Sequence, residues 1–197
     1  MKIDLSNIQF DYNSKVILTY LFICIGAWFL NIISRGKTNK LLFENYRSSP
    51  LNPLTYVRLF THCIGHKDWE HLVGNFLYIL LVGPMIEEKY GSINLIIMFA
   101  ITSLAISLFN ILFTDYAVLG ASGNVYMLIV LSSFANISEG KIPLTVILIC
   151  IFYCLGEAKR LLLEKKSKIY HDGHLIGAFC GILFGFIFLK YKTFPFL

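Results

Sequence analysis

Six stretches of the chain contain no charged residue. The core of a bilayer is about 30 Å thick, and a helix needs roughly 20 apolar residues to cross it. The stretches that approach this length are residues 16–33, 72–86, 93–113, 117–137, 142–156 and 173–189. The fifth is only 15 residues long, so it must include flanking residues or lie where the bilayer is thin. We therefore predict six membrane-spanning helices.

The polar segments between these stretches complete the predicted fold. We expect one all-α polytopic membrane domain, 1–197, with a short polar head at 1–15. The first span lacks a small-residue cleavage site, so we expect a retained helix and not a signal peptide. The long first loop, 34–70, contains Leu, Phe, Tyr and Trp side chains. Such an apolar loop is expected to lie against the membrane or insert partly into it.

Composition and charge agree with a protein that has the lipid bilayer as its solvent. Hydrophobic residues make up 56% of the chain and charged residues 15%, whereas soluble domains carry about 25% charged residues. The net charge of +5 is not gathered into a basic stripe, so we expect no nucleic-acid partner. The five cysteines are an odd number without a C-x-x-C motif, and predict neither a disulfide framework nor a zinc site.

Polar residues inside predicted spans carry the candidate chemistry, because such residues are costly in a membrane. All five histidines lie near the starts of the second and sixth spans. His71 and Asn75 are four residues apart and share one helix face. Taken alone, this pair is also typical of hydrogen bonds that join membrane helices.

A second candidate segment is Gly120-Ala-Ser122-Gly123. We expect Ser122 in the first turn of a helix, where backbone N–H groups have no partner and the helix dipole is positive. Tyr126 is four residues further on, so it shares a face with Ser122. The alternative is that these small residues serve close helix packing.

The sixth span combines His174 with Gly177 and Gly181. Glycines four residues apart allow another helix to approach closely, and His174 lies one turn before them. His174 can then act as the base that activates the Ser122 hydroxyl. His71, Asn75 and the Ser122 N–H can stabilise the oxyanion. Asp172 is only two residues from His174 and is expected to point elsewhere, which favours a Ser–His dyad.

In their order and spacing, these residues resemble the rhomboid family of intramembrane serine proteases. The resemblance covers His66 to Asn75, Gly83-x-x-x-Glu87 with Gly91-Ser92, the Ser122 segment with Tyr126, and the His174 helix. It implies a rhomboid-like bundle that cleaves transmembrane protein substrates without a cofactor. It also implies that Ser122 is the nucleophile, His174 the base, His71 and Asn75 the oxyanion donors, and Tyr126 a support for His174.

The chain differs from this family at two places. A Trp-Arg pair often anchors the first loop of rhomboids, and here the pair is Val57-Arg58. The residues before the base, His171 and Asp172, are more polar than the family leads us to expect.

Membrane orientation is left open by two opposing arguments. The family orientation places the N-terminus in the cytoplasm, with six of the 17 Lys and Arg residues inside and 11 outside. The positive-inside rule predicts the reverse. The lack of further domains in the chain fits the inner membrane of a prokaryote, and nothing in the sequence indicates an oligomeric state.

Two other functions are compatible with parts of the pattern. The histidines can bind or transport a metal, because imidazole suits zinc, copper and nickel, but this leaves the Ser, Asn and Gly pattern unexplained. An inactive rhomboid-like binding factor is the other alternative, although such relatives have usually lost the Ser or the His. A zinc protease is disfavoured because H-E-x-x-H is absent, and the six spans contain no Asp or Glu for an aspartyl protease.

Overall fold

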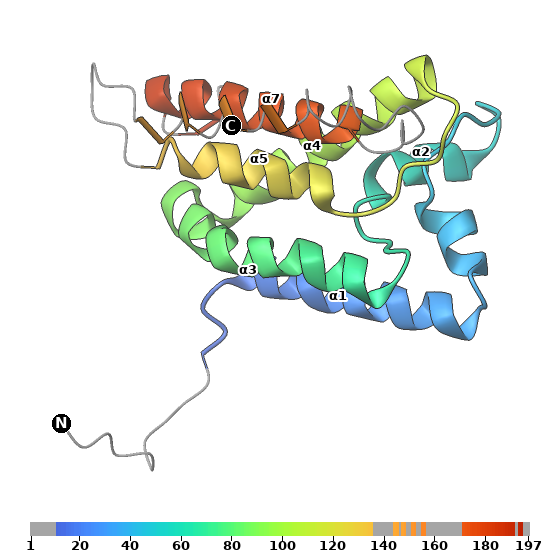
Figure 1. Cartoon of the computed structure of the whole chain (residues 1–197). Coiled ribbons are helices and arrows are strands. Elements are labelled where there is room, and N and C mark those ends of the chain that lie inside the picture. Colours follow the sequence, from blue (N-terminus) through green and yellow to red (C-terminus); the bar gives the residue numbers. More distant parts are fainter. Residues whose placement is uncertain are drawn as a thin grey trace, which may run out of the picture.

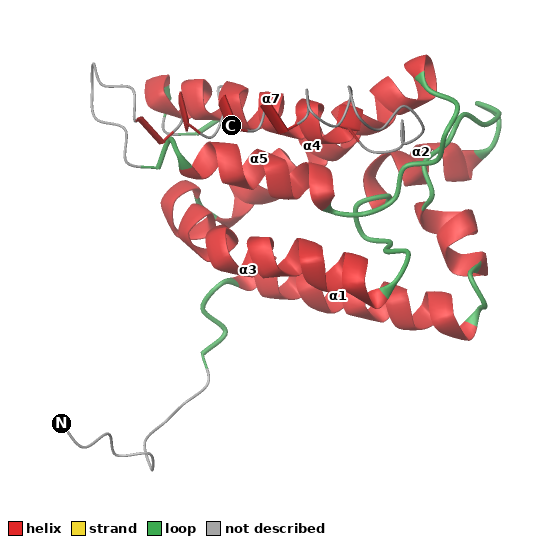
Figure 2. Ribbon diagram, in the orientation of Figure 1, coloured by secondary structure: helices red, strands yellow, loops and turns green. Residues whose placement is uncertain are grey.

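The described part of the chain is built from helices joined by loops (Figure 2). The computed structural model describes residues 11–135, 144–145, 147–148, 151–152, 155–156, 171–191 and 193–194. The helices are α1 (Lys15–Ile33), η2 (Asn39–Phe43, one turn of π-helix), α2 (Pro53–Thr61), α3 (Trp69–Tyr90), α4 (Ser92–Phe113), α5 (Ser122–Ser132) and α7 (His171–Lys190). Within these residues the only extended pairing is one antiparallel bridge between Asn45 and Val118.

The helices pack as two neighbouring pairs that meet along α3 and α5. α1 lies beside α3 and α5 beside α7, while α3 also contacts α5 (Figure 1). α4 packs against both α5 and α7, and α2 packs against α4. Fully buried Leu72, Ile79, Met98 and Leu128 form the centre of the main hydrophobic core. The contact between α3 and α5 is where the candidate site lies.

Four of these helices are long and apolar enough to cross a membrane. They are α1, α3, α4 and residues Asp172–Lys190 of α7, and α5 is a shorter apolar helix of 11 residues. Large apolar side chains such as Phe22, Phe29 and Ile33 on α1 are exposed. A large exposed apolar surface of this kind is typical of contact with a membrane, where these side chains face lipid. The protein is an all-α, multi-pass membrane protein.

The predicted spans agree with the helices except at the fourth. The first, second, third and sixth correspond to α1, α3, α4 and α7, although α3 continues beyond the second span through the charged Glu87 and Lys89. The fourth was expected over 117–137, but α5 begins only at Ser122 because Val118 pairs with Asn45 and Gly120 has a φ of +118°. The fifth, 142–156, is described only in part: residues 144–145, 147–148, 151–152 and 155–156 are helical, and the others lie outside the described residues.

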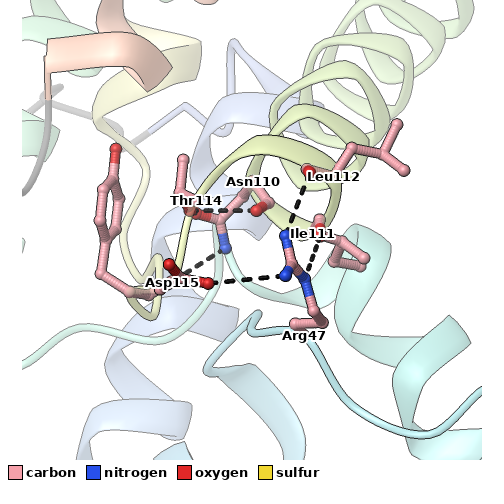
Figure 3. A network of polar contacts seen from close by, with 7 residues as sticks. Arg47, Asn110, Ile111, Leu112, Thr114 and Asp115 are labelled. Carbon is pink, nitrogen blue, oxygen red and sulfur yellow. Dashed lines mark hydrogen bonds and ion pairs between the residues drawn. The ribbon is translucent and has the colours of Figure 1, made fainter.

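The first loop is anchored by arginines in place of the expected Trp-Arg pair. The Arg58 side chain is 2% exposed, its Nε donates to the Leu54 carbonyl at 3.0 Å, and its guanidinium lies 4.4 Å from the centre of the Tyr46 ring. Arg47 donates to the Ile111 and Leu112 carbonyls at the end of α4 and pairs with Asp115 at 3.6 Å (Figure 3). Tyr46 thus supplies the aromatic partner that Val57 cannot.

Glu87 joins the end of α3 to the starts of two other helices. Its carboxylate accepts hydrogen bonds from the Ser14 hydroxyl at 2.5 Å, from the Val16 and Ile17 N–H groups, and from the Ser92 hydroxyl at 2.7 Å. Val16 and Ile17 lie in the first turn of α1, where unpaired N–H groups and the helix dipole favour an anion. The motif Gly83-x-x-x-Glu87 therefore fixes how α1 and α4 meet α3.

Candidate active site

One face of α3 supplies the first wall of the site. His71, Gly74, Asn75 and Tyr78 follow the i, i+3, i+4, i+7 spacing of a single helix face. The helix begins just before them because the Asp68 side chain accepts the His71 N–H at 2.8 Å as an N-cap. Asn75 is 7% exposed, and its Nδ2 has no hydrogen-bond partner. The face therefore presents a donor that is not used by the fold.

The backbone before α5 closes against this face at Gly120. The Gly120 N–H donates to the His62 carbonyl at 2.8 Å, and its φ of +118° is one that other residues rarely adopt. A Cβ at this position would lie 2.7 Å from His71 Nε2 and 3.6 Å from Asn75 Nδ2. Glycine thus allows His71 and Asn75 to approach the backbone two residues before Ser122.

Ser122 is the first residue of α5, as the sequence predicted. The helix starts after Ala121, which provides no side-chain cap. The N–H groups of this first turn point away from the helix body without an intrahelical acceptor. The Ser122 hydroxyl and its own N–H are therefore near the positive end of the helix dipole.

α7 reaches α5 through its glycines. A Cβ on Gly177 would collide with the Gly123 carbonyl oxygen, and one on Gly181 would lie 2.6 Å from the Met127 carbonyl oxygen. This close approach brings the His174 ring over the Tyr126 ring, with centroids 4.3 Å apart and planes 31° apart. The two rings form a tilted pair at the α5–α7 contact.

All five polar residues predicted for the site line one cavity. The cavity has a volume of about 570 Å³ and lies between α3, α5 and the start of α7. Its walls include His71, Asn75, Ser122, Tyr126 and His174. Its remaining lining residues are Lys67, Asp68, Gly74, Tyr78, Val125 and Ile129. Residues 103 positions apart in sequence, from His71 to His174, thus share one space.

The other walls of this cavity are not among the site residues predicted from the sequence. Val125 and Ile129 lie three and seven residues after Ser122, and Gly74 and Tyr78 hold the same positions relative to His71. Extending each predicted pair by helical periodicity would have found them. Glu87 was noted only as part of a motif, and its role between helices depends on Ser14, which lies 73 residues away.

The two other described histidines of the first loop lie outside this cavity and bond to backbone carbonyls. His62 Nε2 pairs with the Ser103 carbonyl and His66 Nδ1 with the Ile64 carbonyl, both at 3.1 Å. Burial lowers the pKa of His62 to about 4. Burial, together with the nearby His71, lowers the pKa of His66 to about 4. Both rings are therefore neutral at physiological pH.

No metal-binding cluster is present among the described residues. No three His, Cys, Asp or Glu side chains come together there in a group that could hold an ion. Of the histidines that suggested a metal in the sequence, His71 and His174 line the cavity and His62 and His66 bond to backbone carbonyls, while the side chain of His171 lies outside the described part.

The Asp172 side chain, which the sequence predicts to point elsewhere than toward His174, bonds to Tyr116. Its Oδ2 accepts a hydrogen bond from the Tyr116 hydroxyl at 2.8 Å. Tyr116 lies in the loop between α4 and α5. The acidic group beside His174 is thus held by the segment that leads to Ser122.

The fold and the cavity define a class of protein. It is a polytopic helical membrane protein with a polar site, containing a Ser, a His and amide donors, between its helices. The family comparison is specific: residues 53–191 match the model of the Rhomboid domain. The chain therefore belongs to the rhomboid family.

Curated relatives come from bacteria, plants and animals. The chain is 28% identical over 176 residues to "Rhomboid protease GluP" of Bacillus subtilis, covering 85% of this chain and 34% of the relative. It is 25% identical over 192 residues to "Rhomboid-like protein 11, chloroplastic" of Arabidopsis thaliana, covering 90% and 65%. It is 29% identical over 142 residues to "Rhomboid-related protein 1" of Caenorhabditis elegans, covering 67% and 40%. The chain thus spans between about a third and two thirds of these relatives' length.

Proposed function

We propose that the protein is an intramembrane serine endopeptidase that uses Ser122 as nucleophile and His174 as base. The observation that carries this proposal is the shared cavity of about 570 Å³, which contains both residues together with His71, Asn75 and Tyr126. Membership of the rhomboid family, which includes a relative named as a protease, supports the same chemistry.

Each residue has a role in the proposed reaction. The Ser122 hydroxyl attacks the scissile carbonyl while His174 accepts its proton, and the same imidazole then protonates the leaving amine. Water hydrolyses the acyl-enzyme in a second step with His174 again as the base. The tilted ring contact with Tyr126 keeps the imidazole in one orientation.

The oxyanion donors are the Ser122 N–H, the Asn75 amide and the His71 ring. Support for Asn75 comes from its buried Nδ2, which has no partner in the fold and lies near the Gly120 backbone. Donors that are fixed before the reaction stabilise the developing negative charge without having to reorganise.

Transmembrane segments are the substrates that fit this location. The cavity lies between membrane helices, and Val125 and Ile129 contribute apolar walls to it. We propose that a substrate segment leaves the bilayer and unwinds locally, so that its backbone reaches Ser122. Among the relatives a bacterial and a chloroplast protein both occur, and the inner membrane of a prokaryote stays the proposed location.

Cleavage of a fluorescent transmembrane peptide in liposomes tests this function. Ser122→Ala and His174→Ala are each expected to reduce turnover by at least about a thousandfold, because nucleophile and base act as a unit. Ser132→Ala is the matched control, since Ser132 lies on the same helix and its hydroxyl donates to the Ile129 carbonyl in its own turn. Equal turnover in the wild type and Ser122→Ala would contradict the proposal, and an inactive wild type would favour a rhomboid-like binding protein.

A further inference from the structure

A hydrogen bond connects the two segments that carry Ser122 and His174. The Tyr116 hydroxyl donates to Asp172 Oδ2 at 2.8 Å. Tyr116 lies six residues before Ser122, and Asp172 lies two residues before His174 in the first turn of α7. The bond therefore joins the segment that leads to the nucleophile to the segment that leads to the base.

Tyr116 is itself held in place from the other side. Asn110 Nδ2 on α4 donates to the Tyr116 carbonyl at 3.1 Å and to the Asn45 carbonyl at 3.0 Å. Asn45 in turn pairs with Val118 through two backbone hydrogen bonds of 2.8 and 3.0 Å. The phenol thus extends from a loop that is bonded both to α4 and to the first loop, so it is a fixed point for α7.

Tyr116 and Gly173, the residue after Asp172, lie close to Ser122. Tyr116, Gly173 and Ser122 line one small cavity of about 20 Å³. The Gly173 carbonyl oxygen is 3.3 Å from the position that a Cβ on Gly123 would occupy. The first turns of α5 and α7 are therefore in contact where the Tyr116–Asp172 bond closes.

The rest of the α5–α7 contact is close but not directional. Gly177 and Gly181 face backbone atoms of α5, and glycine surfaces allow close approach without side chains that interlock. A smooth contact of this kind resists separation of the helices more than sliding or rotation. A hydrogen bond depends on distance and angle, so one bond at the end of α7 can fix the position that the glycines leave free.

We propose that Tyr116 and Asp172 are positioning residues whose hydrogen bond sets the register of α7 and keeps the His174 ring in place beside Ser122. The inference rests on the proposed function, because it assigns the pair an effect on the Ser122–His174 dyad. Neither residue lines the cavity that holds the dyad. Both therefore act through the backbone of the segments that carry Ser122 and His174.

Peptide cleavage by purified variants in liposomes tests the pair. Tyr116→Phe and Asp172→Ala are each expected to lower kcat about tenfold, the effect of one hydrogen bond, with KM within about twofold of the wild type. Asp172→Asn keeps an oxygen acceptor and is expected to recover most of this loss. The Tyr116→Phe/Asp172→Ala double variant is expected to be no slower than either single variant, since both remove the same bond. Tyr56→Phe is the control, because Tyr56 is exposed on α2.

A spectroscopic measurement separates this inference from the proposed function. The ring resonances of His174, assigned by comparison with His174→Ala in detergent micelles, are expected to shift in Tyr116→Phe and to stay unchanged in Tyr56→Phe. If the wild type cleaves peptide but Tyr116→Phe matches Tyr56→Phe in kcat, the positioning role is wrong while the protease function stands. Losses that multiply in the double variant would also overturn it. If the wild type does not cleave, unshifted His174 resonances overturn the positioning role independently.

Discussion

Asn75 Nδ2 is a buried amide donor without a hydrogen-bond partner in the fold. Leaving such a group unpaired costs about 1–3 kcal/mol in a protein interior. A fold that retains this cost at the wall of the candidate cavity fits a donor kept for a transition state. At Asn75, the unpaired amide lowers the stability of the fold but is available to stabilise the oxyanion.

Replacing Asn75 by alanine is expected to separate these two demands. Asn75→Ala should lower kcat about a hundredfold, as the loss of one oxyanion donor does. It should leave the melting temperature in detergent unchanged or higher, because no Nδ2 hydrogen bond is lost. Gly26→Ala on α1 is the control, since a Cβ there meets no atom within 4 Å and Gly26 does not line the cavity. A fall in melting temperature with unchanged kcat would show that Asn75 has only a structural role.

At the residue scale, local spacing carried most of the information about the cavity. His71 with Asn75 and Ser122 with Tyr126 are one helical turn apart, so the sequence alone places each pair on one face. Partners that are distant in sequence have no such signal. The bond from Tyr116 to Asp172 joins residues 56 positions apart, and only the packing of α7 on α5 brings them together.

Among the elements, the glycine face of α7 determines how closely it approaches α5. Gly177→Ala places a Cβ against the Gly123 carbonyl, where backbone atoms cannot move aside easily. We expect it to lower the melting temperature and to abolish most peptide cleavage, because α7 carries His174. Gly26→Ala on α1 is the matched control, as its Cβ meets nothing within 4 Å. Equal activity and stability in the two variants would contradict the close α5–α7 contact.

A substitution at the end of α3, at Glu87, is expected to lower the stability of the protein. Glu87→Gln keeps the shape of the side chain but removes the charge that receives the Ser14 hydroxyl and the N–H groups of α1. Hydrogen bonds to charged groups contribute about 1.5–3 kcal/mol each. We therefore expect a loss of about 2–3 kcal/mol in the free energy of unfolding.

Chemical denaturation in mixed detergent micelles measures this loss. The neighbouring Glu88→Gln is the control, because Glu88 is exposed and should change stability by less than about 0.5 kcal/mol. If the two variants were equally stable, Glu87 would not be the connection between α1, α3 and α4.

Hydrophobic patterning predicted most elements but not where the fourth begins. The stretch 117–137 is free of charge, so hydropathy reads it as one span. Its first residues instead form the bridge of Val118 with Asn45 and the turn at Gly120. The pairing partner, Asn45, is in the first loop, 73 residues away, and hydropathy contains no information about it.

In the whole molecule, two buried histidines couple stability to pH. The pKa values of His62 and His66 are about 4 in the folded protein, against about 6.5 in an unfolded chain. Between these values the unfolded state binds more protons, so stability decreases as the pH falls from about 6.5 toward 4. The effect amounts to about 3 kcal/mol per histidine at the acid end.

Melting temperatures in detergent from about pH 7 to about pH 5 measure this coupling. The wild type is expected to melt at lower temperature as the pH falls. His62→Gln, which can still donate to the Ser103 carbonyl that His62 bonds, is expected to show a weaker dependence, since one of the histidines with a lowered pKa no longer titrates. An identical pH dependence in both proteins would show that His62 is not neutral and buried.

Two of the basic residues that the family orientation places outside the membrane have partners within the fold. Arg58 and Arg47 are two of the 11 basic residues that the family orientation places outside. Arg58 is buried in the first loop, and Arg47 is bonded to the end of α4 and to Asp115. The positive-inside rule concerns cations of flanking loops near the ends of spans, and these two have structural partners that the sequence does not reveal.

Covalent labelling of Ser122 by a fluorophosphonate, followed by mass spectrometry of the purified protein, tests the central proposal most directly. Such a reagent reacts with an activated serine and not with an ordinary hydroxyl. The account predicts labelling at Ser122 in the wild type, its loss in His174→Ala, and no label on Ser132 of the same helix. Labelling of Ser122 that is unchanged in His174→Ala, or no labelling of Ser122 in a folded wild type, would contradict a Ser122–His174 dyad.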